Sequence, residues 1–92
     1  MYPTLNDLHA SEHYYLRVNL GGTYKYVVYD EFHDDVTINT EEVMNATAFS
    51  SLEEAKHLRN STRCLRSIPN IYIDIIKHTV KVSDVTDEVV ED

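Results

Sequence analysis

Two adjacent glycines between two segments of alternating polarity constrain the fold of this chain more than any other feature. Residues 14–20 carry apolar side chains at every second position, and residues 23–30 are rich in Tyr and Val and place aromatic side chains on both faces. Glycine adopts positive φ without a steric cost, so Gly21-Gly22 suits the tight turn that joins two antiparallel strands. The pattern predicts a β-hairpin whose strands are residues 14–20 and 23–30.

A helix is predicted to begin near residue 50. Ser50 lies three residues before Glu53 and Ser51 lies three before Glu54, and both pairs fit the reciprocal capping box of a helix N-terminus. Ser67 and Pro69 signal its end, which gives a helix of about four turns. Its apolar stripe consists of Leu52, Ala55, Leu58, Thr62 and Leu65.

The remaining segments complete an α+β fold. Residues 36–38 indicate a short third strand within an acidic stretch, and residues 70–82, rich in Ile, Val and Tyr, indicate a C-terminal strand. We expect one small antiparallel sheet with a single helix packed on one face. The predicted boundaries are a flexible or partly helical arm at 1–12, a single domain at 13–82 and an acidic tail at 83–92.

Composition narrows the classes of function. The 92 residues carry a formal charge of −8, which disfavours general attraction to nucleic acid or to anionic membranes and favours a partner with a basic surface. Cys64 is the single cysteine, so no intramolecular disulfide can form. There is no secretory pattern at residues 1–7 and no long apolar run, so we expect a cytoplasmic protein without a membrane span.

Acidic residues of the middle segment are the leading candidates for a binding surface. Carboxylates held at intervals on a small domain can imitate phosphates and occupy the basic groove of another protein. Solubility alone also explains such residues, so both interpretations are open. The candidates are Asp30, Glu31, Asp34, Asp35, Glu41 and Glu42.

The face of the hairpin that points away from the helix is a second candidate surface. Aromatic and cationic side chains on it could dock a partner or pair with a second copy of the chain to form a homodimer. The expected members of this face are Tyr15, Arg17, Lys25 and Tyr29.

Basic residues of the helix support an alternative function. Their spacings of three, four and three residues place them on one helical face, where they could contact phosphate, or simply complement the helix dipole and nearby acids. In the first case the chain would be a dimeric regulator that associates with nucleic acid. The residues are Lys56, Arg59, Arg63 and Arg66.

Two patterns with catalytic associations are weighed against their surroundings. His9 and His13 fit a His-x-x-Glu-His zinc pattern, but this pattern needs a stable helix and a third ligand, and here it lies in a weakly helical arm. Cys64 falls near the predicted C-terminus of the helix, where the dipole disfavours a thiolate. We expect no enzyme activity, no metal and no cofactor.

The hairpin and helix start resemble those of small accessory proteins of bacteriophages and prophages. The likeness covers roughly residues 13–82 and rests on residues 14–18, 26–28 and 48–55. It transfers no functional residue. It implies an intracellular protein that binds a host or phage macromolecule, for example an inhibitor of a nuclease or another defence enzyme. The predicted function is therefore that of a noncatalytic protein-binding or inhibitory module.

Overall fold

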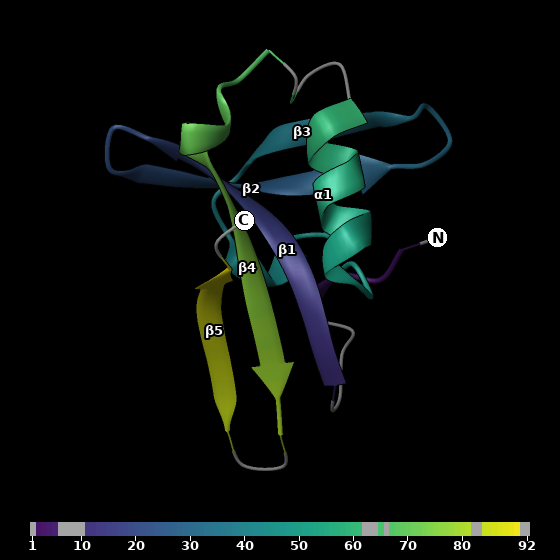
Figure 1. The fold of residues 1–92 in the computed structure, drawn as a ribbon, viewed down its shortest axis with the longest axis vertical. Helices are drawn as coiled ribbons and strands as arrows, with labels where there is room; N and C mark the ends of the chain where they lie inside the picture. The colour runs from purple at the N-terminus through teal and green to yellow at the C-terminus, as the bar shows by residue number, and fades with distance from the viewer. Residues whose placement is uncertain (1, 6–10, 62–64, 66, 82–83, 91–92) are drawn as a thin grey trace.

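The computed structural model of the chain describes residues 2–5, 11–61, 65, 67–81 and 84–90, and its fold is α+β as predicted. In these residues one antiparallel sheet has the strand order β3-β2-β1-β4-β5, and helix α1 packs across it (Figure 1). The elements are β1 (Ser11–Leu20), β2 (Thr23–Asp30), β3 (Asp35–Thr40), the 3-10 turn η2 (Val43–Asn45), α1 (Leu52–Ser61), the 3-10 turn η3 (Asn70–Tyr72), β4 (Ile73–Val80) and β5 (Val85–Val90).

The glycine turn forms as predicted and sets the register of the hairpin. Gly21 and Gly22 have φ angles of 62° and 92°, and Leu20 pairs directly with Thr23. Positive φ at both central residues is the requirement of the type I′ turn. A two-residue loop leaves no freedom in the pairing, so it decides which side chains of β2 share a face with those of β1.

This register corrects the expected composition of the two sheet faces. Val18 lies opposite Lys25, so Lys25 and Tyr29 share the face of Val18, which is the face that α1 covers. Tyr15 and Arg17 lie on the other face, since Arg17 pairs with Tyr26. The four residues expected to form one surface are therefore divided between two.

A short segment outside the named strands holds β1 and β2 apart beyond the hairpin. The two strands pair only near their turn, and farther along β1 runs down Figure 1 whereas β2 runs across it. Phe49 and Tyr14 exchange two backbone hydrogen bonds of 2.7 and 2.8 Å, and the Thr47 N–H donates to the Val27 carbonyl at 3.1 Å. Residues 46–49 thus bridge the opening between the strands, and the Phe49 side chain is buried, with 1% exposed.

The larger apolar cluster lies between α1 and the sheet. The predicted stripe of the helix supplies its buried members Ala55, Leu58 and Leu65. The Ser51 hydroxyl accepts a 3.1 Å hydrogen bond from the Glu54 N–H, which confirms one of the two hydrogen bonds of the predicted capping box. The other buried members are Leu16, Val18, Val27, Val36, Phe49, Ile73 and Ile75.

Residues 2–5, the start of the arm predicted to be flexible or partly helical, pack against the core through Leu5. Leu5 is 1% exposed and packs with Tyr15 and Ile76 on the sheet face away from α1. The Leu5 N–H donates to the Ala46 carbonyl at 3.1 Å, and the Ala48 N–H donates to the Pro3 carbonyl at 2.9 Å. Both sheet faces carry apolar side chains, so the second face needs a cover, and Leu5 contributes to it.

A fifth strand lies where the sequence indicated an acidic tail. β5 pairs along β4, with Val90 opposite Ile75 and Asp87 opposite His78. Val90 packs against the larger apolar cluster. The acids of this segment stand between Val and Thr residues, which favour extended structure, so the segment extends the sheet despite its charge.

Candidate functional site

The turn between β2 and β3 is fixed by hydrogen bonds from its own side chains. Asp30 Oδ1 accepts from the Phe32 N–H at 3.0 Å, and Asp30 Oδ2 contacts His33 Nδ1 at 2.5 Å. This second contact lowers the pKa of Asp30 and raises the pKa of His33. The Tyr29 hydroxyl donates to Asp34 Oδ1 at 2.7 Å. A turn held in this way keeps one conformation at low entropic cost on binding.

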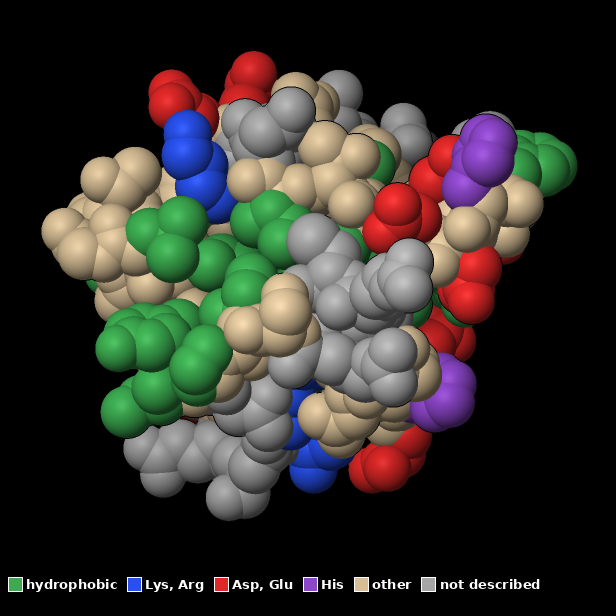
Figure 2. Space-filling view, turned by 90° about the horizontal axis from the view of Figure 1, so that it is seen from above, with side chains coloured by type: hydrophobic (Ala, Val, Ile, Leu, Met, Phe, Trp, Pro, Cys, Tyr) green, Lys and Arg blue, Asp and Glu red, His purple; other side chains and the backbone are tan. Residues whose placement is uncertain are grey.

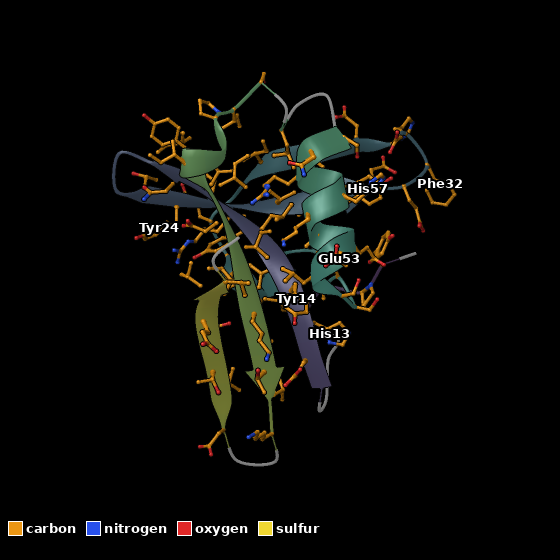
Figure 3. All side chains as sticks on the ribbon, viewed as in Figure 1. His13, Tyr14, Tyr24, Phe32, Glu53 and His57 are labelled. Carbon is orange, nitrogen blue, oxygen red and sulfur yellow. The ribbon has the colours of Figure 1, made fainter. Side chains whose placement is uncertain are left out.

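Phe32 projects from the tip of this turn into solvent. It is 82% exposed, and Figure 3 shows its side chain pointing away from the sheet and the helix. An isolated exposed apolar residue needs no explanation on its own. Here, however, the residue stands on an ordered turn among four carboxylates, which is the composition of an apolar anchor with a charged rim.

Two adjoining pockets lie beside the turn and share Tyr2 and Tyr29. The first, of about 220 Å³, separates the turn from α1 and is also lined by Asp34, Phe49, Glu54, His57, Leu58 and Ser61. The second, of about 240 Å³, runs beneath the turn and is also lined by Thr4, Val28, Asp30, Glu31, Phe32 and Thr47. The Tyr2 ring meets those of Tyr29 and Phe49 edge-on, at centroid distances of 5.6 and 5.3 Å.

The electrostatic environment of the pockets is negative. The pKa of Tyr2 is raised by burial and then by the charges of Glu54 and Glu31. The hydrogen bond to Asp34, followed by burial, raises the pKa of Tyr29 to about 12. Burial and neighbouring carboxylates together raise both pKa values, and the carboxylate part of these surroundings favours a bound cation. A row of acidic side chains along one side of the molecule is visible in Figure 2.

The structure brings together four of the six predicted acidic residues. Asp30, Glu31, Asp34 and Asp35 all belong to this turn and are exposed. Glu41 and Glu42 follow the far end of β3, which is roughly 20 Å long at about 3.4 Å per residue. Glu41 is engaged by Lys25 Nζ at 2.7 Å, so the second pair of acids forms a separate surface.

The predicted surface on the sheet does not assemble. Tyr15 is 3% exposed and belongs to the second apolar cluster. Arg17 forms a 2.8 Å ion pair with Asp74, and its guanidinium lies 4.2 Å from the ring centroid of Tyr24. Lys25 pairs with Glu41, and Tyr29 lines the pockets on the opposite face.

The predicted basic face of the helix does not form a solvent-facing ridge where it is described. Arg59 is only 7% exposed, because its position on α1 turns it toward the sheet with Ala55 and Leu58. Lys56 is half-buried. Arg63 and Arg66 lie outside the described residues.

The patterns with catalytic associations gain no support from the described residues. His13 lies in β1, so it is not in a helix, while His9 and Cys64 fall outside the described part. No group of three or more His, Cys, Asp or Glu side chains that could hold a metal ion occurs in the described residues. Within the same residues, no helix has the length and apolar character needed to cross a bilayer.

No match to this chain was found among family models, curated proteins or solved structures. Function is therefore inferred from the chain's own geometry.

Three residues of the site were not predicted from the sequence as site residues: Tyr2, Phe32 and Glu54. Phe32 had a readable signal, since it is an aromatic residue within a polar turn sequence, whereas Tyr2 and Glu54 reach the site only through tertiary packing.

A second group of exposed apolar residues lies at the other end of β2. It consists of Leu20 and Tyr24 on the hairpin and Ile71 and Tyr72 on η3. Figure 1 shows η3 beside the hairpin, on the side of the sheet away from the β2–β3 turn. Ile71 is 82% exposed, the same fraction as Phe32, and this equality makes it a useful control.

Proposed function

We propose that this chain is a protein-binding module that docks its β2–β3 turn onto a partner with a basic surface. The single observation that carries the proposal is the exposure of Phe32, 82%, on a turn fixed by the Asp30 and Tyr29 hydrogen bonds. In this binding mode Phe32 enters an apolar depression of the partner. The carboxylates around it face basic side chains at the rim.

Two physical effects favour such binding, one from the aromatic anchor and one from the acidic charge. Aromatic residues at the centre of an interface are typical hot spots, and their truncation commonly costs about 2 kcal/mol or more. The acidic rim and the net charge of −8 accelerate encounter with a basic partner and disfavour acidic competitors. Anchor and rim therefore supply affinity and selectivity, respectively.

The class of partner follows from the same charges. Four carboxylates on one turn present negative charge at several points, as a stretch of phosphates does. We therefore propose that the partner is a protein with a basic groove, such as a nucleic-acid-binding enzyme, and that occupation of this groove inhibits it. Binding alone produces this effect.

The test compares variants that match in exposure or in charge. Tagged wild-type protein, Phe32→Ala and Ile71→Ala are used to capture proteins from a nuclease-treated lysate of the source cells. We expect at least one protein to be retained by wild type and by Ile71→Ala and to be lost from Phe32→Ala. Retention should fall as salt rises, since the rim is exposed.

A second pair of variants separates local charge from net charge. Glu31→Lys and Glu42→Lys change the total charge equally, but only Glu31 belongs to the turn. We expect Glu31→Lys to weaken retention more than Glu42→Lys does. Equal retention by wild type and Phe32→Ala would contradict the proposal, as would loss of every retained protein after nuclease treatment.

A further inference from the structure

Glu54 holds a buried carboxylate oxygen that accepts no hydrogen bond from the described residues. Its Oε1 atom is buried and has no hydrogen-bond partner there. In a complete capping box this side chain would turn back to the N-cap N–H. Buried polar atoms are almost always hydrogen-bonded, because an unsatisfied one costs free energy. Glu54 is also one of the residues that line the first pocket, so a turn of its carboxylate would present this oxygen to a donor bound there.

The other walls of the first pocket define the chemistry of this donor. Rings of Tyr2, Tyr29 and Phe49 line it, and a second carboxylate, Asp34, comes from the turn. Aromatic faces and carboxylates together favour a cation. A quaternary ammonium has no N–H group and would leave Glu54 Oε1 unsatisfied, so the cation must carry N–H donors.

We propose that this pocket binds the guanidinium group of an arginine side chain. Guanidinium is planar, stacks on aromatic rings, is weakly hydrated and offers five N–H donors in a rigid plane. Its donors can reach Glu54 on one wall and Asp34 on the other. The volume of about 220 Å³ is below the roughly 300–1,000 Å³ of sites for drug-sized ligands, and it suits the end of one side chain.

The inference rests on the proposed function, because the arginine belongs to the partner that the turn engages. The two pockets share Tyr2 and Tyr29, and Phe32 lines the second. One partner can therefore insert an arginine beside α1 while it receives Phe32. The arginine of the partner also supplies the hydrogen bond that Glu54 Oε1 lacks. It therefore adds selectivity for a basic partner beyond the long-range attraction of the acids.

The experiment uses a small probe and needs no knowledge of the partner. The ¹⁵N-labelled full-length chain is titrated with Nα-acetyl-arginine N-methylamide and with its citrulline analogue, which has a similar shape but no charge. We expect the arginine probe to shift the backbone amide signals of Tyr29, Glu54 and Leu58 in a saturable manner. The citrulline probe should bind at least tenfold more weakly.

Two neighbouring glutamates give the matched variants. Glu54→Gln keeps the size of the side chain and removes its charge, and Glu53→Gln makes the same change one residue earlier at an exposed position. Glu53 is labelled on α1 in Figure 3. We expect Glu54→Gln to weaken the arginine probe at least tenfold, while Glu53→Gln stays within twofold of wild type.

Equal binding of the arginine and citrulline probes to the wild-type chain would overturn the inference, and so would equal effects of the two glutamate variants. The first comparison needs no substitution, so it does not depend on the folding of a variant. If the probes fail but Phe32→Ala still abolishes protein capture, the arginine pocket falls and the proposed function stands. If the arginine probe binds as expected but Phe32→Ala leaves capture unchanged, the proposed function falls instead.

Discussion

The Tyr29 hydroxyl group donates a 2.7 Å hydrogen bond to Asp34 and so joins the end of β2 to the last residue of the turn. Asp34 has a φ of 49°, the single positive φ among the described residues other than glycine. Aspartate tolerates this left-handed conformation better than most residues do. The hydrogen bond thus supports the one backbone position at which the turn departs from ordinary geometry.

The first prediction concerns alkaline pH. The pKa of Tyr29 is about 12 in the folded chain, against an ordinary value of 10.0. Between these values the unfolded chain has released the proton and the folded chain retains it, so the free energy of unfolding falls as pH rises. This stabilisation is complete below pH 10 and is lost through pH 12.

Urea unfolding from pH 9 to pH 12 tests the first prediction. We expect the urea midpoint of the wild type to fall more steeply over this range than that of Tyr29→Phe or Asp34→Asn. Tyr2 and Tyr15 also have raised pKa values, so a smaller fall remains in both variants. Superimposable profiles for wild type and Tyr29→Phe would contradict the prediction.

The second prediction compares the two phenylalanines of the chain. Phe49 is 1% exposed and belongs to the larger apolar cluster, whereas Phe32 is 82% exposed. Truncation of a buried phenylalanine to alanine costs about 3–5 kcal/mol through lost burial and cavity formation. A surface substitution changes stability by about 0.5 kcal/mol or less.

Chemical denaturation measures both free energies of unfolding. We expect Phe32→Ala to match wild type within about 0.5 kcal/mol. Phe49→Ala should lose about 3–5 kcal/mol, which can unfold a domain of this size. Phe49→Leu is therefore included as a milder variant, with an intermediate loss. A cost for Phe32→Ala close to that for Phe49→Leu would mean that the turn packs against the core.

The features predictable from sequence are those that depend on a few neighbouring residues. Gly21-Gly22 encodes its turn through backbone freedom, and Ser51 encodes the helix start through one local hydrogen bond. Both predictions are confirmed. So is the short third strand, which β3 contains.

The features that sequence reasoning missed depend on pairing between distant segments. β5 is weakly encoded by itself, since its acids suggest a solvated tail, and it becomes a strand by pairing with β4. Leu5 is likewise a lone apolar residue until residues 46–48 lie beside it. Arg59 looks like a surface charge until the packing of α1 buries it. Charge gives no information about such tertiary constraints.

The third prediction concerns the attachment of β5. His78 Nδ1 lies 2.6 Å from Asp87 Oδ1, and the His78 side chain is 3% exposed. Asp87→Ala leaves this buried ring nitrogen without its partner, so we expect a loss of about 1–3 kcal/mol. Glu88→Ala is the control, because Glu88 is exposed on the other face of β5.

Amide hydrogen exchange checks the third prediction. Backbone amides that form the hydrogen bonds between β4 and β5 should exchange faster in Asp87→Ala than in wild type. The exchange rates of the hairpin amides at 17–26 should change less. Glu88→Ala should exchange like wild type. Identical exchange in Asp87→Ala and Glu88→Ala would mean that backbone pairing and Val90 hold β5 without the histidine contact.

The fourth prediction separates two effects of the glutamates that begin α1. Glu53 and Glu54 both lie in the first helical turn, where a negative charge is stabilising by about 0.3–1 kcal/mol. Only Glu54 also has a buried oxygen without a hydrogen bond from the described residues. An unsatisfied buried polar atom costs about 1–3 kcal/mol, and the cost is greater for a charged group than for a neutral amide.

Thermal and urea unfolding of Glu53→Gln and Glu54→Gln at neutral pH isolate the burial effect, because the helix-dipole contribution is similar in both. We expect Glu53→Gln to be slightly less stable than wild type. Glu54→Gln should be more stable than Glu53→Gln by about 1 kcal/mol, since Oε1 of the Glu54 carboxylate is buried without a hydrogen-bond partner among the described residues. A Glu54→Gln variant less stable than Glu53→Gln would show that the glutamate is already satisfied within the free chain. Its oxygen would then not be available to a ligand.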